Sequence, residues 1–422
     1  MQQDDPDKES VGVFVWKYCG KIKDEQEKAM TETVRAIVEE IRLRRFRAFE
    51  NARLTLSDLT FLIGRNGAGK SSLLDAVDLL REAVSDSLEN ALDRRGGLQK
   101  VQCATSGRGR KPPMGIALVL RIIFPGNRQT QAIYGFEVKG KPKGSSWHIR
   151  ECFKSSKETT FERKDDTFHG KLDVSPPAGN LVMPLIAGSD SLWGLILNTI
   201  RNLRAYELSP AHMASAPEIG ERSTLARDGA NAGDVLKAVQ GTADHRWVVE
   251  RLGTITEGIN DVRAEALLGR RVLRFVQRFE DGELNLDARQ VSQGTLRSLG
   301  VLLALKQKPS PSVVLIDEIE NSVHPSALAV LLDAALASCY DTRVVLTSHS
   351  PEVLSHPAVT GERVRVVEWR DGASRIFRLS PETQESVNEI DTVGWMLRSN
   401  ALWTGPQPET IEDDDLFAFE SY

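Results

Sequence analysis

Two adjacent carboxylates, Asp317 and Glu318, directly follow four apolar residues at 313–316. Such a run is typical of a strand buried on both faces, whose carboxyl end opens at the edge of a parallel sheet. At that edge one carboxylate could hold a magnesium ion, usually through water, while the other orients or deprotonates an attacking water. An exposed acidic turn would not explain the apolar run. The pair therefore predicts one half of a site for phosphoryl transfer.

The other half is predicted by GRNGAGKS at 64–71, which satisfies the pattern G-x-x-x-x-G-K-[ST]. It follows an apolar stretch at 60–63 and precedes an amphipathic helical pattern that starts at Leu73. Glycines let the backbone N–H groups turn toward phosphate oxygens, and the helix N-terminus favours anions. Lys70 would bridge the β- and γ-phosphates, and the Ser71 hydroxyl would ligate magnesium. The nucleotide-binding residues predicted here are Gly64, Asn66, Gly67, Gly69, Lys70, Ser71 and Ser72.

Two further segments are less specific. VSQGTLR at 291–297 begins a helical pattern, so the Ser292 hydroxyl and the Gly294 N–H could meet an anion. Ser292 could equally be a simple N-cap. His349 follows the apolar strand pattern at 343–348 and could donate to a γ-phosphate, although a lone histidine is more often structural.

In this order, GRNGAGKSS, VSQGTLR, LIDEIENSVHP and TSHSP resemble the Walker A, signature, Walker B with D-loop, and switch-histidine motifs of ABC-type ATPases. They are most similar to the soluble branch that includes RecF, the SMC proteins and the OLD nucleases. The S-x-G-T-L-R signature, the E-N-x-x-H-P ending and RDGANAGDVLKAV (227–239) look like stand-alone AAA-type ATPases of prokaryotic defence. The resemblance covers roughly residues 35–380. It implies an α/β fold, an ABC-type P-loop ATPase head with an antiparallel β lobe and an inserted helical lid.

The resemblance also implies ATP and Mg²⁺ as ligands and a homodimer of heads packed head to tail, with higher oligomers possible. Ser292 and Gly294 of one subunit would then touch the γ-phosphate held by Lys70 of the other. The catalytic residues would be Glu318, His349 and Lys70, the metal ligands Ser71 and Asp317, and the residues at the dimer seam Asn321 and His324.

Two departures from the family pattern stand out. Gln293 occupies a signature position where the family often has Asp, which should change little. The glutamine loop is not placed, because Gln99, Gln102 and Gln131 are all candidates without persuasive context.

The predicted organisation has five parts. They are an N-terminal extension (1–34), an N-terminal ATPase lobe with Walker A and the β subdomain (35–184), an inserted helical lid (185–270), a C-terminal ATPase lobe with the signature, Walker B and the switch histidine (271–380), and a C-terminal helix with an acidic tail (381–422). Within a predicted hairpin at 41–56, the four arginines Arg42, Arg44, Arg45 and Arg47 could bind phosphate, but strand alternation favours a solvated face.

The composition indicates in which cellular compartment the protein is expected. The 422 residues carry a formal net charge of −5, with 41% hydrophobic and 27% charged residues, as in ordinary soluble domains. The four cysteines are scattered without a CxxC pair, the N-terminus does not resemble a signal peptide, and no apolar stretch approaches the ~20 residues of a membrane span. A cytoplasmic protein without a membrane segment is predicted.

The spacing of the motifs argues against several classes of ABC-type ATPase. Lys70 and Ser292 are 222 positions apart, and the resemblance implies a much shorter insertion for transporter ATPases. The insertion also lacks the sustained heptad repeat of an SMC coiled coil. About 40 residues follow the last predicted hairpin, too few for the Toprim nuclease domain of OLD proteins. The chain is thus predicted to be an ATPase without its own effector.

Two functions remain open at this point. In the first, the chain senses or regulates a separately encoded nuclease or toxin in antiphage defence. The tail DDDLFAFESY could dock that partner, or it could equally be a disordered tail. In the second, it is a RecF-like DNA-binding ATPase of repair or recombination. Its basic loop would then face nucleic acid, through Arg94, Arg95, Lys100, Arg108, Arg110 and Lys111.

Overall fold

The computed structural model describes most of the chain from residue 33 onward. The described ranges are 33–104, 112–140, 147–156, 158–170, 174–176, 179–188, 192–220, 222–280, 282–340, 342–389, 391–411 and 415–419. Residues 1–32 of the predicted N-terminal extension lie outside them.

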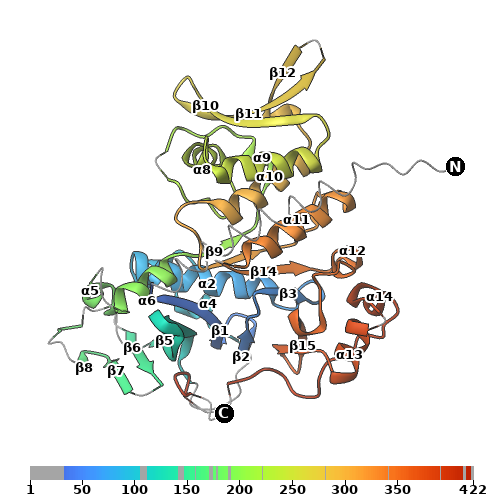
Figure 1. The fold of residues 1–422 in the computed structure, drawn as a ribbon. Helices are drawn as coiled ribbons and strands as arrows, with labels where there is room; N and C mark the ends of the chain where they lie inside the picture. Colours follow the sequence, from blue (N-terminus) through green and yellow to red (C-terminus); the bar gives the residue numbers. More distant parts are fainter. Residues whose placement is uncertain are drawn as a thin grey trace.

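One thirteen-stranded sheet organises the molecule, in the order β8-β7-β6-β5-β4-β1-β2-β16-β15-β3-β14-β13-β9 (Figure 1). Its parallel half contains β15 (Val364–Arg370), β3 (Leu59–Ile63), β14 (Arg343–Ser348), β13 (Val313–Ile316) and β9 (Leu203–Tyr206). Its antiparallel half contains β1 (Arg35–Phe46), β2 (Phe49–Thr55), β4 (Met114–Phe124), β5 (Arg128–Gly140), β6 (Trp147–Ser155), β7 (Glu158–Lys164) and β8 (Thr167–Gly170), while β16 (Ala373–Phe377) joins β15 to β2.

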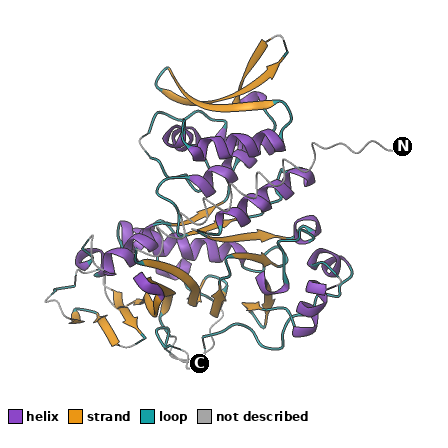
Figure 2. Ribbon diagram, viewed as in Figure 1, coloured by secondary structure: helices purple, strands orange, loops and turns teal. Residues whose placement is uncertain are grey.

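Helices pack on both faces of the sheet (Figure 2). One face carries α2 (Lys70–Ser85), α3 (Leu88–Asp93), α4 (Leu98–Val101), α5 (Met183–Ile186) and α6 (Leu192–Arg201), and the other carries α10 (Gln293–Lys306), α11 (Pro325–Ser338) and α12 (Pro351–Leu354). The residues of β13 alternate between the two cores, with Val313 and Leu315 toward α2 and Val314 and Ile316 toward α10. All four are fully buried, as the apolar run predicts for a central parallel strand.

The insertion between the two halves of the ATPase differs from the expected all-helical lid. It contains α7 (Pro210–Met213), α8 (Ala232–Val239) and α9 (Ala243–Ile255), but also β9 and β10 (Ile259–Leu267). β10 forms a separate antiparallel sheet with β11 (Arg270–Phe279) and β12 (Gly282–Asp287), at the top of Figure 1. The sequence concealed both strands, because β9 has only four residues and directly follows α6, and β10 is rich in helix-forming Ala, Glu and Leu.

Short 3₁₀ turns and two helices complete the described chain. The turns are η1 (Pro125–Asn127), η2 (Ala288–Gln290) and η3 (Gly361–Arg363), and the helices are α13 (Pro381–Glu389) and α14 (Val393–Arg398), where one C-terminal helix was predicted. No described helix is both long enough and apolar enough to cross a membrane.

The prediction of a solvated arginine face on β1 is wrong. Arg42, Arg44 and Arg45 are only 3%, 8% and 4% exposed. The partners are Glu40 for Arg42, Glu137 for Arg44, the carbonyl oxygen of Pro112 for Arg45, and Asp75 for Arg47. The C-terminal segment lies on β1 at Arg42, which also donates to the carbonyl oxygens of Leu416 and Ala418, so these buried charges have partners within the protein.

The described part of the acidic tail, residues 415–419, packs on its own chain. Leu416 and Phe417 are fully buried in a small cluster on the antiparallel half of the sheet. Asp415 pairs with Arg150 at 2.7 Å, and Arg42 donates a hydrogen bond to the carbonyl oxygen of Ala418 at 2.6 Å. These residues are therefore occupied within the subunit rather than free to dock a partner.

The basic loop after α2 is also largely neutralised where it is described. Arg94 pairs with Asp86 at 2.6 Å, and Arg95 pairs with Asp75 and Glu82 at 2.7 Å each. Arg108, Arg110 and Lys111 lie outside the described residues. The described part of this loop gives no specific support to the DNA-binding alternative.

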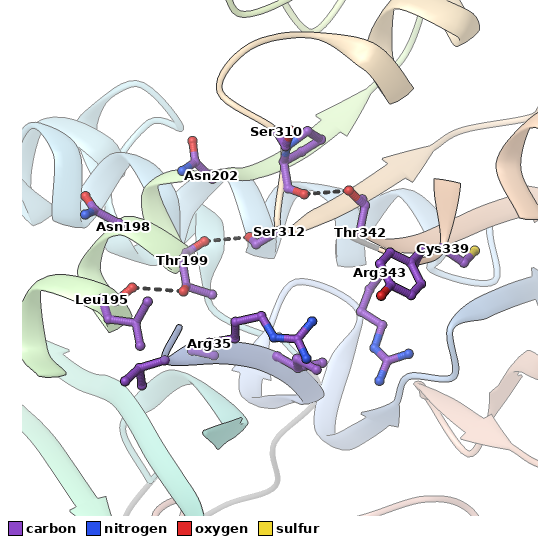
Figure 3. A pocket seen from close by; sticks show the side chains of 15 residues that line it. Arg35, Leu195, Asn198, Thr199, Asn202, Ser310, Ser312, Cys339, Thr342 and Arg343 are labelled. Carbon is purple, nitrogen blue, oxygen red and sulfur yellow. Dashed lines mark hydrogen bonds between the residues drawn. The ribbon is translucent and has the colours of Figure 1, made fainter. Parts of the chain in front are cut away.

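A cavity of about 540 Å³ lies where the parallel strands begin, at the opposite end from Asp317 and His349. Its walls come from β1, α6 and the segments that precede β13 and β14. Ser312 Oγ donates to the carbonyl oxygen of Thr199 at 2.6 Å (Figure 3). Thr342 Oγ1 donates to the carbonyl oxygen of Pro311 at 2.8 Å. These bonds fix the starting points of the strands whose far ends carry the candidate site.

Candidate nucleotide-binding site

The phosphate-binding loop joins β3 to α2, as the sequence predicts. Gly69 has φ = 111°, and a Cβ atom there would lie 2.5 Å from Ser374 Oγ of β16, so only glycine fits. Lys70 Nζ donates to the loop's own carbonyl oxygens, at 2.6 Å to Gly64 and 3.3 Å to Arg65. Burial lowers the pKa of Lys70, an effect that the nearby carboxylates partly offset. The ammonium group is thus held over the loop that would receive phosphates.

The two predicted metal ligands lie side by side. Ser71 Oγ, at the start of α2, donates to Asp317 Oδ2, at the end of β13, over 3.0 Å. Adjacent oxygen ligands of an octahedral magnesium ion lie about 3 Å apart, since each Mg–O bond is about 2.0–2.1 Å. Magnesium commonly uses only one or two protein carboxylates together with substrate phosphates. The donor set fits magnesium, and the spacing of these two oxygens suits one shared ion.

Thr347, near the end of β14, is a site residue that sequence analysis missed. Its hydroxyl donates to Asp317 Oδ1 at 2.5 Å and accepts the backbone N–H of Glu318 at 2.7 Å. The side chain is fully buried. It therefore fixes both acids of the pair from the neighbouring strand, and the only sequence signal was its position two residues before His349.

We expect Thr347→Val to lower ATP hydrolysis about tenfold while ATP binding changes less than about threefold. Valine keeps the volume but leaves the Glu318 N–H without an acceptor, a loss worth about 1–3 kcal/mol, or roughly tenfold in a rate when it falls on the transition state. Phosphate release and titration with a fluorescent ATP analogue measure the two effects. Thr347→Ser, which keeps the hydroxyl, should stay within about threefold of wild type, and equal losses in both variants would exclude the hydroxyl's role.

Glu318 and Glu320 have different surroundings. Glu318 adopts φ = 47°, and its carboxylate has no hydrogen-bond partner within the described residues, so it remains available to a water molecule. Glu320 Oε1 accepts the backbone N–H of His349 at 2.8 Å and lies 3.2 Å from its Nδ1. Glu320 thus holds the imidazole of His349, whose side chain is about half exposed.

The signature residues lie on the surface at the start of α10. Ser292 caps this helix by accepting the Thr295 N–H at 3.0 Å, and it is exposed. A Cβ atom on Gly294 would lie 2.8 Å from the carbonyl oxygen of Ser322, so the signature packs against the D-loop of its own chain. The cavity of about 850 Å³ beside the phosphate loop is lined by residues of 63–68 and by His349, and by none of residues 291–297. The signature of one chain does not complete that chain's own site.

Arg297, in the same segment, is a second residue whose role the sequence did not reveal. It is 3% exposed and donates to the carbonyl oxygens of Leu208 (2.5 Å), Asp317 (2.7 Å) and Glu318 (2.6 Å). Burial lowers its pKa, and the charges of Glu318, Glu320 and Asp317 oppose that shift. Arg297 therefore clamps α10 to the backbone of the acid pair within one subunit.

None of the glutamine-loop candidates belongs to the site. Gln99 lies in α4, Gln102 forms a bridge with Phe46, and Gln131 lies in β5. The fold instead places Glu207 near this edge, because it follows β9, whose Tyr206 is level with Ile316 of β13.

No curated protein matches the chain at a significant level. Two solved structures are similar in fold. One is the SMC head bound to the C-winged helix domain of ScpA, with 14% identity and a TM-score of 0.50 over 82% of this chain and 99% of that chain. The other is the SMC head with an extended coiled coil bound to the C-terminal domain of ScpA, from Pyrococcus furiosus, with 12% identity and a TM-score of 0.51 over 84% of this chain and 99% of that one.

These likenesses bear on the fold alone, and they confirm the predicted fold class, a P-loop ATPase head of the ABC and SMC type. The family assignment rests on a separate match. Residues 59–355, well over half of the chain, match the family described as "AAA domain, putative AbiEii toxin, Type IV TA system". The span runs from β3 through the phosphate loop, signature and acid pair to just beyond His349. The chain belongs to this family of P-loop ATPases.

Proposed function

We propose that this chain hydrolyses ATP with Mg²⁺ as a head-to-tail homodimer, and that the dimer regulates a separately encoded effector, a nuclease or toxin of antiphage defence. The observation that carries the dimer is the position of the signature. Ser292 is exposed at the start of α10, Gly294 beside it packs against its own D-loop, and neither residue lines the cavity beside its own phosphate loop. A second subunit can bring that surface to the nucleotide.

The family description connects the proposal to toxin–antitoxin systems, since it reads "putative AbiEii toxin, Type IV TA system". The proposed division of the chain at residues 34, 184, 270 and 380 stays a prediction, as do the cytoplasmic location and the identity of the effector.

The residues divide the reaction between them as follows. Lys70 exchanges its bonds to the Gly64 and Arg65 carbonyls for bonds to the β- and γ-phosphates, while the N–H groups of residues 64–72 surround the phosphates. Glu318 takes a proton from a water whose oxygen attacks the γ-phosphorus, and the bond to the β-γ bridging oxygen breaks to leave ADP. His349, held by Glu320, donates to a γ-phosphate oxygen. A magnesium ion held by Ser71 and Asp317 would neutralise charge on the phosphates.

Asn321 and His324 support the same geometry. Both are exposed, next to Ser322, whose carbonyl oxygen contacts the signature. His324 caps α11 through Ser326. In the proposed dimer they lie at the seam, where they can respond to the state of the opposite site.

A complementation experiment tests the composite site. Lys70→Ala removes the phosphate ligand, and Ser292→Asp keeps an N-cap for α10 but places a negative charge where the γ-phosphate would lie. Each variant alone should be inactive. Mixed in equal amounts, half the dimers pair the two variants and each contains one intact site, so about a quarter of wild-type hydrolysis or less should return.

The control mixture combines Lys70→Ala with Glu318→Gln. Those two residues belong to the same site of one subunit, so in each heterodimer one site lacks the lysine and the other lacks the glutamate. No intact site forms, and the control mixture should stay inactive. If the first mixture also stays as inactive as its components, the head-to-tail arrangement is excluded.

A further inference from the structure

A second cavity, of about 360 Å³, lies between α2, β9 and the segment that precedes α8. Four arginines line it, together with a single carboxylate among the described lining residues. The arginines are Arg81, Arg204, Arg222 and Arg227, and the carboxylate is Asp78. We call this cavity the arginine pocket. Its volume falls in the range of small-ligand sites, which is roughly 300–1,000 Å³.

The charges of the arginine pocket are only partly paired. Asp78 contacts Arg81 at 3.3 Å and Arg227 at 2.8 Å. Burial raises the pKa of Asp78, against the opposing effect of these two arginines. Arg81 also lies 3.6 Å from Glu82, and Arg227 lies 3.6 Å from Glu207. These ion pairs involve Arg81 and Arg227 but not Arg204.

Arg204 forms no ion pair with a carboxylate of the described residues. Its guanidinium donates to the backbone oxygens of Arg201 (2.5 Å) and Leu203 (2.7 Å) and, at 3.4 Å, to Asn202 Oδ1. Burial lowers the pKa of Arg204, and the positive charge of Arg81 acts in the same direction. The Arg81 Nε atom is itself buried without a hydrogen-bond partner among the described residues. Arg204 is thus a partly buried cation that lines the same cavity as Arg81 and has no ion pair among the described residues, an arrangement that costs stability unless an anion joins it.

We propose that the arginine pocket binds a phosphate group, carried either by a small phosphorylated molecule or by a nucleic-acid backbone. Guanidinium groups present several donors in one plane and bind phosphate through two parallel bonds, which suits a site built from arginines rather than lysines. A purely structural cluster would pair its charges, as Asp78 does for Arg227. It would not require Arg204 in the wall of an open cavity.

The arginine pocket is distinct from the phosphate loop but adjacent to the acid pair. Arg204 lies beside Val314 of β13 in the sheet. Two residues later, the carbonyl oxygen of Tyr206, which also lines the pocket, accepts the Asp317 N–H at 2.9 Å. An anion bound at Arg204 would therefore rest on the strand that neighbours the predicted metal ligand.

Binding can be measured with the full chain carrying Lys70→Ala, which removes the main phosphate ligand of the nucleotide site. Isothermal titration with inorganic pyrophosphate and fluorescence anisotropy with a labelled single strand of about 12 nucleotides provide the two probes. Adding Arg204→Gln, or separately Arg222→Gln, should weaken binding about tenfold or more, because each removes a charge-assisted bond to phosphate. Arg222 is exposed, so its replacement should not disturb folding.

Arg343→Gln is the matched control, since Arg343 is also half-buried on a parallel strand but lines the cavity at the other end of the sheet. It should leave binding unchanged. Pyrophosphate binding lost in the Arg204 and Arg222 variants supports a small ligand, and binding of the strand alone, lost in the same variants, supports a nucleic-acid backbone. The proposal is overturned if neither probe binds, or if both bind the variants and the control equally.

Discussion

Glu318→Gln should hydrolyse ATP about 100 to 10,000 times more slowly than the wild-type chain, which is the usual contribution of a positioned general base. Glutamine keeps the size and hydrogen-bonding reach of the side chain but cannot accept the proton of the attacking water. The geometry around it should survive, because Glu318 is held by its backbone, through its N–H bond to Thr347 and its carbonyl bond to Arg297. ATP affinity should change little.

The variant should therefore accumulate in the ATP-bound state. Single-turnover phosphate release measures the rate, and size-exclusion chromatography with light scattering, with and without Mg-ATP, measures the dimer. Glu362→Gln, an exposed glutamate in η3, is the control and should behave as wild type. Hydrolysis by Glu318→Gln within about tenfold of wild type would remove Glu318 from the role of base.

Lys70→Ala should weaken ATP binding about 10- to 100-fold, since each charge-assisted hydrogen bond that it removes is worth about 1.5–3 kcal/mol. The loop should remain folded in this variant, because the Lys70 ammonium contacts only two loop carbonyls and the backbone is fixed by glycines and by packing on β16. Hydrolysis should fall with the loss of bound nucleotide.

Equilibrium titration with a fluorescent ATP analogue measures this loss, and thermal unfolding without nucleotide checks the fold. Lys237→Ala, which removes an exposed lysine from α8, should leave the affinity unchanged. Unaltered ATP affinity in Lys70→Ala would contradict the assignment of the phosphate loop as the nucleotide site.

The features that the sequence predicted correctly are local ones. The strand, loop and helix around 64–71 follow from glycine spacing and the apolar run before it, and β13 follows from four apolar residues before two acids. Their neighbours in the sheet could also be expected, since alternating strands and helices imply parallel pairing. The structure brings Ser71 and Asp317 within hydrogen-bonding distance, although 246 positions separate them.

The features that sequence analysis missed depend on partners distant in the chain. Burial of Arg44 is decided by Glu137, and burial of Arg42 by the last described residues, neither of which strand alternation can indicate. Thr347 and Arg297 are ordinary residues of a strand and a helix until the sheet register places their donors on the acid pair. The strand β9 was not predicted because it is too short to show a periodic pattern. The arginine pocket, which β9 lines, could therefore not be predicted either.

The hydrogen bonds of Arg297 couple the two active sites of the proposed dimer. One rigid helix, α10, presents Ser292 at its start, and less than two turns later it grips the backbone on both sides of the bond between Asp317 and Glu318. In the proposed dimer, a shift of that backbone during hydrolysis in one site must also move α10, and with it the Ser292 that contacts the nucleotide in the other site. The two sites would then hydrolyse ATP cooperatively, and the hydrolysis rate should depend on ATP concentration in a sigmoidal rather than a hyperbolic way.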